Sequence, residues 1–205
     1  ITQALTEAVS LVQKQQLQRE SNQFFEQEAS SKLALMLTQP CADLHGHAAL
    51  TFDQNQYFTT LILNTGEQML HMSDPDRSAL FAQIRKQLGS YHMSELHTMK
   101  HTAYVILHLY GSKKQPPQTM VRICQYIRDL LHRYQISRFH LVLGDTVKGY
   151  ENVYISYNSA VLLLQSAFFT PYDTILHPYE EGDTIAVTYM NEFPSRFREA
   201  LSARD

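Results

Sequence analysis

The order of periodic segments from Tyr57 onward most constrains the fold of this 205-residue chain. Short apolar, β-branched runs that are typical of buried strands alternate with segments whose apolar residues recur at helical spacing. The expected strands are 57–63, 94–101, 103–110, 139–143 and 173–177, and the expected helices lie between Ser73 and Gly89, over Met120 to Tyr134 and over 153–169. This β-α-β-β-α-β-α-β order predicts an α+β fold. Two right-handed βαβ units sharing an antiparallel hairpin form a ferredoxin-like antiparallel sheet with helices packed on one face, which the last helix and strand extend.

The stretch LVLGDTVKGYENVYISYNSAVLLLQSAFFTPYDTI, residues 141–175, is the most distinctive part of the chain. It predicts a buried strand that ends at Gly144, then a turn, then Ser156 and Tyr157 in the first turn of an Ala- and Leu-rich helix. Ser156 and Tyr157 either pack against this turn or contact a small effector, because helix N-termini attract anions.

Two glycines in this stretch invite comparison with a phosphate-binding loop. Tyr150 and Glu151 follow Gly149, where such a loop needs Lys and then Ser or Thr. We therefore expect Gly144 and Gly149 to shape the turn, with Asn152 or Glu151 as the helix cap. Several aromatic side chains are expected in the core: Tyr104, Tyr110, Phe139, Tyr154, Phe168 and Phe169.

The block from Gly144 through Ser156-Tyr157 to Phe168-Phe169 resembles a "G-G-…-SY-x-x-A…(Y/F)-F" block. That block occurs in the central regulatory domain of YesN-like, AraC-type bacterial response regulators, a degenerate relative of the GGDEF nucleotide-cyclase fold. The resemblance implies a connector and dimerisation helix over 1–40, a GGDEF-like domain over 41–185, and an exit helix over 186–205. It implies as partners a receiver domain and a helix-turn-helix DNA-binding domain of the same full-length protein.

The residues at the cyclase positions predict that the chain is not an enzyme. In an active cyclase of this fold, the hairpin between the second and third strands carries Gly-Gly-(Asp/Glu)-Glu-Phe, and an Asp near the end of the first strand binds metal. Here the hairpin, residues 95–103, reads ELHTMKHTA, and the strand Phe58 to Asn64 has no Asp, although Glu67 follows. Two-metal phosphoryl chemistry needs carboxylates on both elements.

No cofactor or metal is expected either. The ten histidines include His45, His47, His97 and His101, but no HExxH or CxxC spacing occurs. His108 and His140 lie in apolar strands, and we expect them to be hydrogen-bonded or at a sheet edge.

Residues 3–37 contain no Gly or Pro and predict one long helix or a helix pair. Its sparse apolar positions are Leu5, Val9, Val12, Leu17 and Phe24. Two readings stay open, a weak coiled coil that forms a homodimer and a monomeric linker helix.

Composition excludes several classes of partner. The net charge is −3 and the seventeen basic residues form no stripe, which argues against direct nucleic-acid binding. No apolar run is long enough to span a membrane. Cys41 and Cys124 lie far apart and are expected to be reduced thiols of a cytoplasmic protein.

Two hypotheses of function follow. The first is a non-catalytic regulatory and dimerisation module that couples a receiver domain to a DNA-binding domain. The alternative is a small-molecule-sensing domain that keeps a pocket from a cyclase ancestor, with Gly144, Ser156 and Tyr157 near the effector.

Overall fold

The computed structural model describes residues 28–40, 52–98 and 104–178. After a helix over 28–36, the elements in chain order are β1 (Tyr57–Asn64), α2 (Asp74–Ser90), β2 (Met93–Thr98), β3 (Tyr104–Gly111), α3 (Pro117–Arg133), β4 (His140–Lys148), η2 (Tyr150–Asn152), α4 (Val153–Ser166), η3 (Ala167–Phe169) and β5 (Thr174–Leu176). This order confirms the predicted α+β class.

The strands form one five-stranded sheet in the order β2-β3-β1-β4-β5. The β2–β3, β3–β1 and β1–β4 pairs are antiparallel, and β5 lies parallel to β4. The sheet is therefore mixed, whereas the sequence predicted an antiparallel one. The cause is the connection through α4, because a helical crossover returns the chain in the same direction as the preceding strand.

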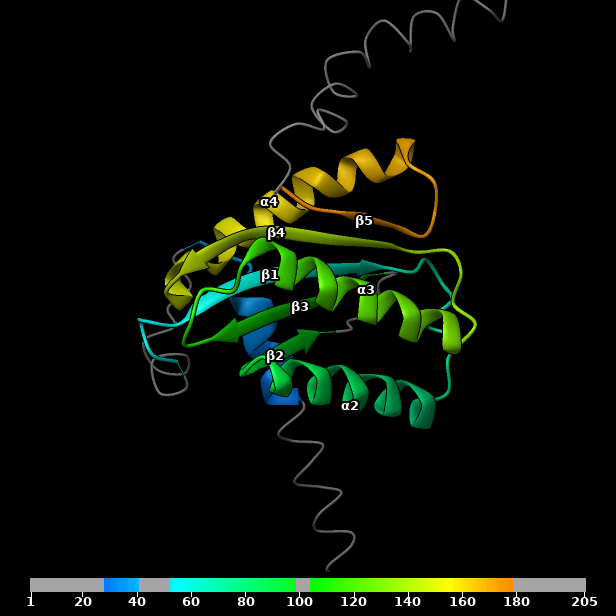
Figure 1. Cartoon of the computed structure of the whole chain (residues 1–205), viewed down its shortest axis with the longest axis horizontal. Helices are drawn as coiled ribbons and strands as arrows, with labels where there is room; N and C mark the ends of the chain where they lie inside the picture. Colours follow the sequence, from blue (N-terminus) through cyan, green and yellow to red (C-terminus); the bar gives the residue numbers. More distant parts are fainter. Residues whose placement is uncertain (1–27, 41–51, 99–103, 179–205) are drawn as a thin grey trace, which may run out of the picture.

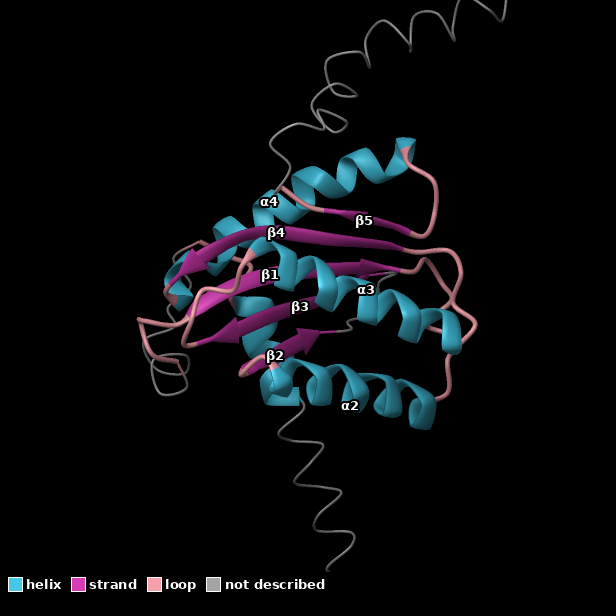
Figure 2. Ribbon diagram, in the orientation of Figure 1, coloured by secondary structure: helices cyan, strands magenta, loops and turns pink. Residues whose placement is uncertain are grey.

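The helices of the two βαβ units, α2 and α3, lie on one face of the sheet as predicted, and helix 28–36 and α4 cover the other face (Figure 1). α2 and α3 cover the face toward the viewer, and helix 28–36 and α4 lie behind it (Figure 2). Successive side chains of a strand point to opposite faces. In β1, Leu61 and Leu63 accordingly join the core under α2 and α3, whereas Phe58 and Ile62 face helix 28–36 and α4.

The helix ends follow from local sequence. Ser73 caps α2 because its Oγ accepts a hydrogen bond from the backbone N–H of Asp76 at 3.2 Å, and Pro75 lies in the first turn, where no partner for its nitrogen is needed. α3 begins with Pro117 and presents one buried stripe, as predicted: Met120, Ile123, Cys124, Ile127, Leu130 and Leu131.

Two predictions on the distinctive stretch were wrong. β4 continues to Lys148, so Gly144 lies inside a strand and not at its end. Phe168 and Phe169 were expected in the core, but they are 87% and 45% exposed, and Tyr104, outside this stretch, is exposed as well. Phe139 is fully buried, as predicted. No helix in the described ranges is both long and apolar enough for a bilayer crossing.

Candidate functional site

A β-bulge in the centre of the sheet brings the distinctive stretch into contact with β1. Between the pairs Thr59–Thr146 and Leu61–Leu143, Gly144 and Asp145 lie opposite the single residue Thr60. Such a bulge interrupts the ladder and leaves backbone donors without strand partners. The N–H of Thr60, which is buried, needs a partner from another element, because a buried unpaired N–H destabilises the fold.

The side chains of α4 supply those partners. Ser156 Oγ is fully buried and accepts a hydrogen bond from the Thr60 N–H at 2.8 Å, and Ser159 Oγ accepts one from the Asp145 N–H at 2.7 Å. Ser159 Oγ in turn donates to the Ser156 carbonyl at 3.0 Å. The two serines therefore close the bulge.

Gly144 is required because the helix approaches it closely. A Cβ built at Gly144 would lie 1.9 Å from the carbonyl oxygen of Ser156. The glycine that the sequence marks as a turn is therefore a packing position. Gly149, with φ +83°, forms the turn. Asn152 occupies the cap position of α4, but its side-chain amide donates to the carbonyl of Lys148 at 2.8 Å and does not cap the helix.

Thr60 also links α4 to helix 28–36 through His108. The Nε2–H of His108 donates to the carbonyl of Ala34 at 2.8 Å, so its Nδ1 accepts from the Thr60 hydroxyl at 3.0 Å. His108 is fully buried, and burial lowers its pKa to about 4, against a smaller opposite effect of the bond to Ala34. The ring is therefore neutral and hydrogen-bonded at both nitrogens, as predicted. We call Ala34, Thr60, His108, Gly144 and Ser156 the Thr60 junction.

Helix 28–36 is fixed to the sheet at two further points. Ser31 Oγ donates to the Thr98 hydroxyl of β2 at 2.9 Å. Ala34 and Leu37 are buried against Phe58 and Leu96. The end of the predicted N-terminal helix is thus part of the domain core. The predicted dimerisation residues Leu5, Val9, Val12, Leu17 and Phe24 lie outside the described residues.

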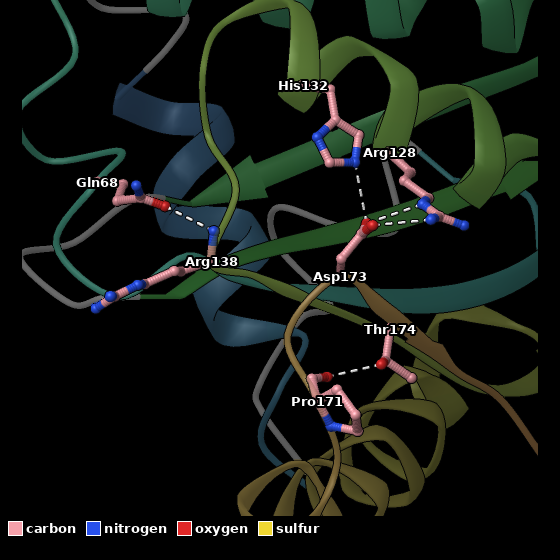
Figure 3. Close-up of polar contacts among 7 residues, drawn as sticks. All are labelled: Gln68, Arg128, His132, Arg138, Pro171, Asp173 and Thr174. Atoms are coloured by element: carbon pink, nitrogen blue, oxygen red, sulfur yellow. Dashed lines mark hydrogen bonds and ion pairs between the residues drawn. The ribbon is translucent and has the colours of Figure 1, made fainter.

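A second polar cluster holds the start of β5 against α3 (Figure 3). Asp173 has a left-handed backbone with φ +66°, and its carboxylate accepts two hydrogen bonds of 2.8 Å from Arg128 and one of 3.1 Å from His132. Burial raises the pKa of Asp173, but Arg128 and His132 outweigh it and hold the pKa below its usual value. The same figure shows the Arg138 N–H bound to Gln68 Oε1 at 2.9 Å, which joins two loops at this end of the sheet.

The positions where a cyclase binds metal lie at the end of β1. Asn64 ends that strand and Thr65 follows it. The Glu67 side chain is exposed, and its Oε2 lies 3.8 Å from Nε2 of His71. Residues 99–103 of the hairpin lie outside the described residues. Within the described ranges, no three His, Cys, Asp or Glu side chains are grouped in a way that would bind a metal ion.

At the β2 edge, Glu95 is almost fully buried between two basic side chains. Its carboxylate accepts from Arg85 Nε at 2.7 Å and pairs with His97 Nδ1 at 2.9 Å. Burial raises the pKa of Glu95, but His97 and Arg85 outweigh it and hold the pKa below the usual value. This carboxylate thus ties β2 to α2 and belongs to the packing of the edge strand.

A family model of the GGDEF-like domain matches residues 44–166. The chain belongs to the GGDEF-like family. The match begins after helix 28–36 and ends at the last residue of α4, so it includes Thr60, His108, Gly144 and Ser156. No curated protein is significantly similar to the chain.

Two residues of the predicted effector region of this GGDEF-like domain, Gly144 and Ser156, are part of the Thr60 junction. Ser156 is completely buried, so a ligand cannot contact its hydroxyl without displacing α4. Tyr157 is half-buried and packs beside Ile62 and Val142. The sequence did not predict the links of Thr60 and Ala34, because a Thr and an Ala in apolar segments carry no signal of a hydrogen-bonded junction.

Proposed function

We propose that this GGDEF-like domain is a non-catalytic regulatory and dimerisation module of a bacterial AraC-type response regulator. In this role it couples a receiver domain to a helix-turn-helix DNA-binding domain in the cytoplasm. Pairing of the receivers shifts the N-terminal helix, and the domain passes that shift to the DNA-binding heads. A coupling free energy on the order of 1–3 kcal/mol is sufficient for such regulation.

The observation that carries the proposal is the docking of helix 28–36 at the Thr60 junction. The Ala34 carbonyl, the His108 ring, the Thr60 hydroxyl and amide and the Ser156 hydroxyl form one buried hydrogen-bonded series. Breaking any of these bonds leaves a buried polar group unsatisfied, which costs about 1–3 kcal/mol. A displacement of helix 28–36 therefore changes the energy of the α4 contact, which makes coupling between the two helices physically reasonable.

The lack of acidic residues at the cyclase positions supports a role without turnover. Asn64 and Thr65 stand where the strand of a cyclase presents a metal ligand, and the hairpin sequence ELHTMKHTA at 95–103 has no Gly and no acidic pair. Incubation of the chain with GTP or ATP and Mg²⁺ tests this part. We expect no cyclic product, and formation of one above a no-protein control would contradict the proposal.

The dimerisation part is tested by the mass of the chain in solution. We expect a concentration-dependent dimer by light scattering, weakened by Val9→Glu on the predicted apolar face of the N-terminal helix. Gln18→Glu serves as the matched control, because nine residues are about two and a half helical turns, which places the same charge on the side of the helix opposite Val9. Equal effects of the two substitutions would rule out pairing through this face.

The coupling part is tested by hydrogen exchange. His108→Phe removes both hydrogen bonds of the ring, to Thr60 and to Ala34. We expect faster exchange of the Thr60 amide and also of α4 amides, although the His108 ring is bonded to Thr60 and Ala34 and not to α4 itself. Unchanged exchange in α4, with faster exchange only in helix 28–36, would show that the two helices are not coupled.

A further inference from the structure

The solvent-facing side of α4 and η3 carries a regular stripe of uncharged residues. Ile155, Leu162 and Phe169 recur seven residues apart and are 43%, 57% and 45% exposed. Asn158 and Gln165 lie between them and are also exposed, so the stripe follows the alternating three- and four-residue spacing of a helix–helix contact. We call these five residues the α4 stripe.

Phe168 enlarges the apolar part of the α4 stripe at its end. Its ring is 87% exposed and lies edge-on to that of Phe169, with 5.0 Å between centroids. Taking roughly 150–250 Å² for a fully exposed large side chain, the apolar members and Phe168 present about 400 Å². With the two amides, two such surfaces approach roughly 1,000 Å² of total buried area, which is the lower limit for a specific interface and is typical of a weak dimer.

The chemistry of the α4 stripe fits a surface identical to itself. No Asp, Glu, Lys, Arg or His occurs from Val153 to Tyr172, so two copies meet here without opposing like charges. Asn158 and Gln165 carry amides, which both donate and accept hydrogen bonds and therefore pair with their own symmetry mates. A two-fold contact places the same patch on both partners, so the patch has to be complementary to itself. An uncharged surface with amides that both donate and accept meets this requirement.

We propose that the α4 stripe forms a two-fold symmetric contact with the α4 stripe of a second copy of this chain. The contact deepens the proposed dimerisation, on which it rests, by adding a second surface on the domain itself. It lies on the same side of the sheet as helix 28–36. Pairing through the N-terminal helix and pairing through α4 are thus compatible with one dimer.

The test is the dimer dissociation constant of the full chain, measured by light scattering or sedimentation over a concentration series. Leu162→Glu places a negative charge on both sides of the contact, and we expect the constant to rise at least tenfold. The matched control is Leu70→Glu, because Leu70 is 42% exposed but belongs to the loop between β1 and α2 and not to the α4 stripe. We expect the control to stay within twofold of the wild type. Circular dichroism and thermal unfolding check that both variants are folded.

Equal constants for Leu162→Glu and Leu70→Glu, or a wild type that is monomeric throughout, would overturn the proposal. Hydrogen exchange of residues 153–169 gives a second readout, and we expect protection that rises with protein concentration. Protection that does not depend on concentration would show that another part of the same chain covers the stripe, and would overturn it too. An effect of Val9→Glu without one of Leu162→Glu would leave the proposed function standing and reject the α4 contact alone.

Discussion

Replacing Gly144 with alanine is the sharpest test of the packing between α4 and the sheet. The added Cβ would lie 1.9 Å from the Ser156 carbonyl oxygen and 2.9 Å from Ser159 Oγ. Ordinary contact needs about 3.5 Å, so α4 has to withdraw by roughly 1.5 Å. That shift breaks the 2.8 Å bond from the Thr60 N–H to Ser156 Oγ.

The cost of Gly144→Ala has two parts. The buried Thr60 N–H loses its partner, which costs about 1–3 kcal/mol, and the overpacked interface costs about 1–3 kcal/mol more. The Asp145 N–H is exposed, so water replaces Ser159 there and adds little. A lower entropy of the unfolded chain offsets about 0.4–1 kcal/mol. We therefore expect the free energy of unfolding to fall by about 1–5.5 kcal/mol.

Urea unfolding followed by circular dichroism measures this change. Gly89→Ala is the matched control, because no atom lies within 4 Å of its added Cβ and Gly89 lies near the end of α2. We expect the control to raise the free energy of unfolding by about 0.5–1 kcal/mol, since alanine is the better helix former. A Gly144→Ala protein within about 0.5 kcal/mol of wild type would refute the argument for close packing.

Three further predictions concern hydrogen bonds and pH. Ser156→Ala should lower the free energy of unfolding by about 1–3 kcal/mol in urea, because the Thr60 N–H stays buried without an acceptor. The pKa of His108 falls from 6.5 to about 4 on folding, so the contribution of its neutral ring is complete above pH 6.5. About 3 kcal/mol of stability is lost as the pH falls from 6.5 to about 4, because the unfolded chain takes up a proton that the buried ring does not. His108→Gln should make the free energy of unfolding less dependent on pH in this range, and an unchanged slope would contradict the burial of the ring. Arg128→Lys keeps the charge but loses the two-point contact with Asp173, so β5 amides should exchange several-fold faster while β3 amides do not.

The strand and helix order was predictable because it depends on local periodicity. Tyr57–Leu63 was expected as a strand and β1 spans Tyr57–Asn64, and the expected helix over 153–169 is α4 followed by η3. β1 is buried on both faces, so its sequence is a continuous apolar, β-branched run, which is typical of a buried strand.

Gly144 was misassigned because a glycine has two structural uses. A turn needs its backbone freedom, and a close helix contact needs its missing side chain. The sequence shows only that a glycine stands there. The contact that decides between the two uses involves Ser156, which lies twelve residues later and on another element.

The exposure of Phe168 was not predicted, because apolar residues lie on both the buried and the exposed sides of the helix over 153–169, so their spacing does not indicate which side faces the sheet. The sequence likewise indicated that the ring nitrogens of His108 are hydrogen-bonded, but it did not identify their partners. Its partners, Ala34 and Thr60, come from distant segments, and such pairs depend on the tertiary fold.

The order of the strands determines how far helix 28–36 lies from the β5 edge of the sheet. Helix 28–36 is fixed to β2 and β3, whereas β5 forms the opposite edge of the sheet, three strands away from β3. Neighbouring strands are about 4.8 Å apart, so the two attachments are separated by roughly 14 Å. If the sheet rotates as a rigid body, this separation converts a tilt at one edge into a displacement of the other edge. A tilt of about 5° at the helix moves the β5 edge by about 1 Å, a distance comparable to the shifts by which packed elements switch between states.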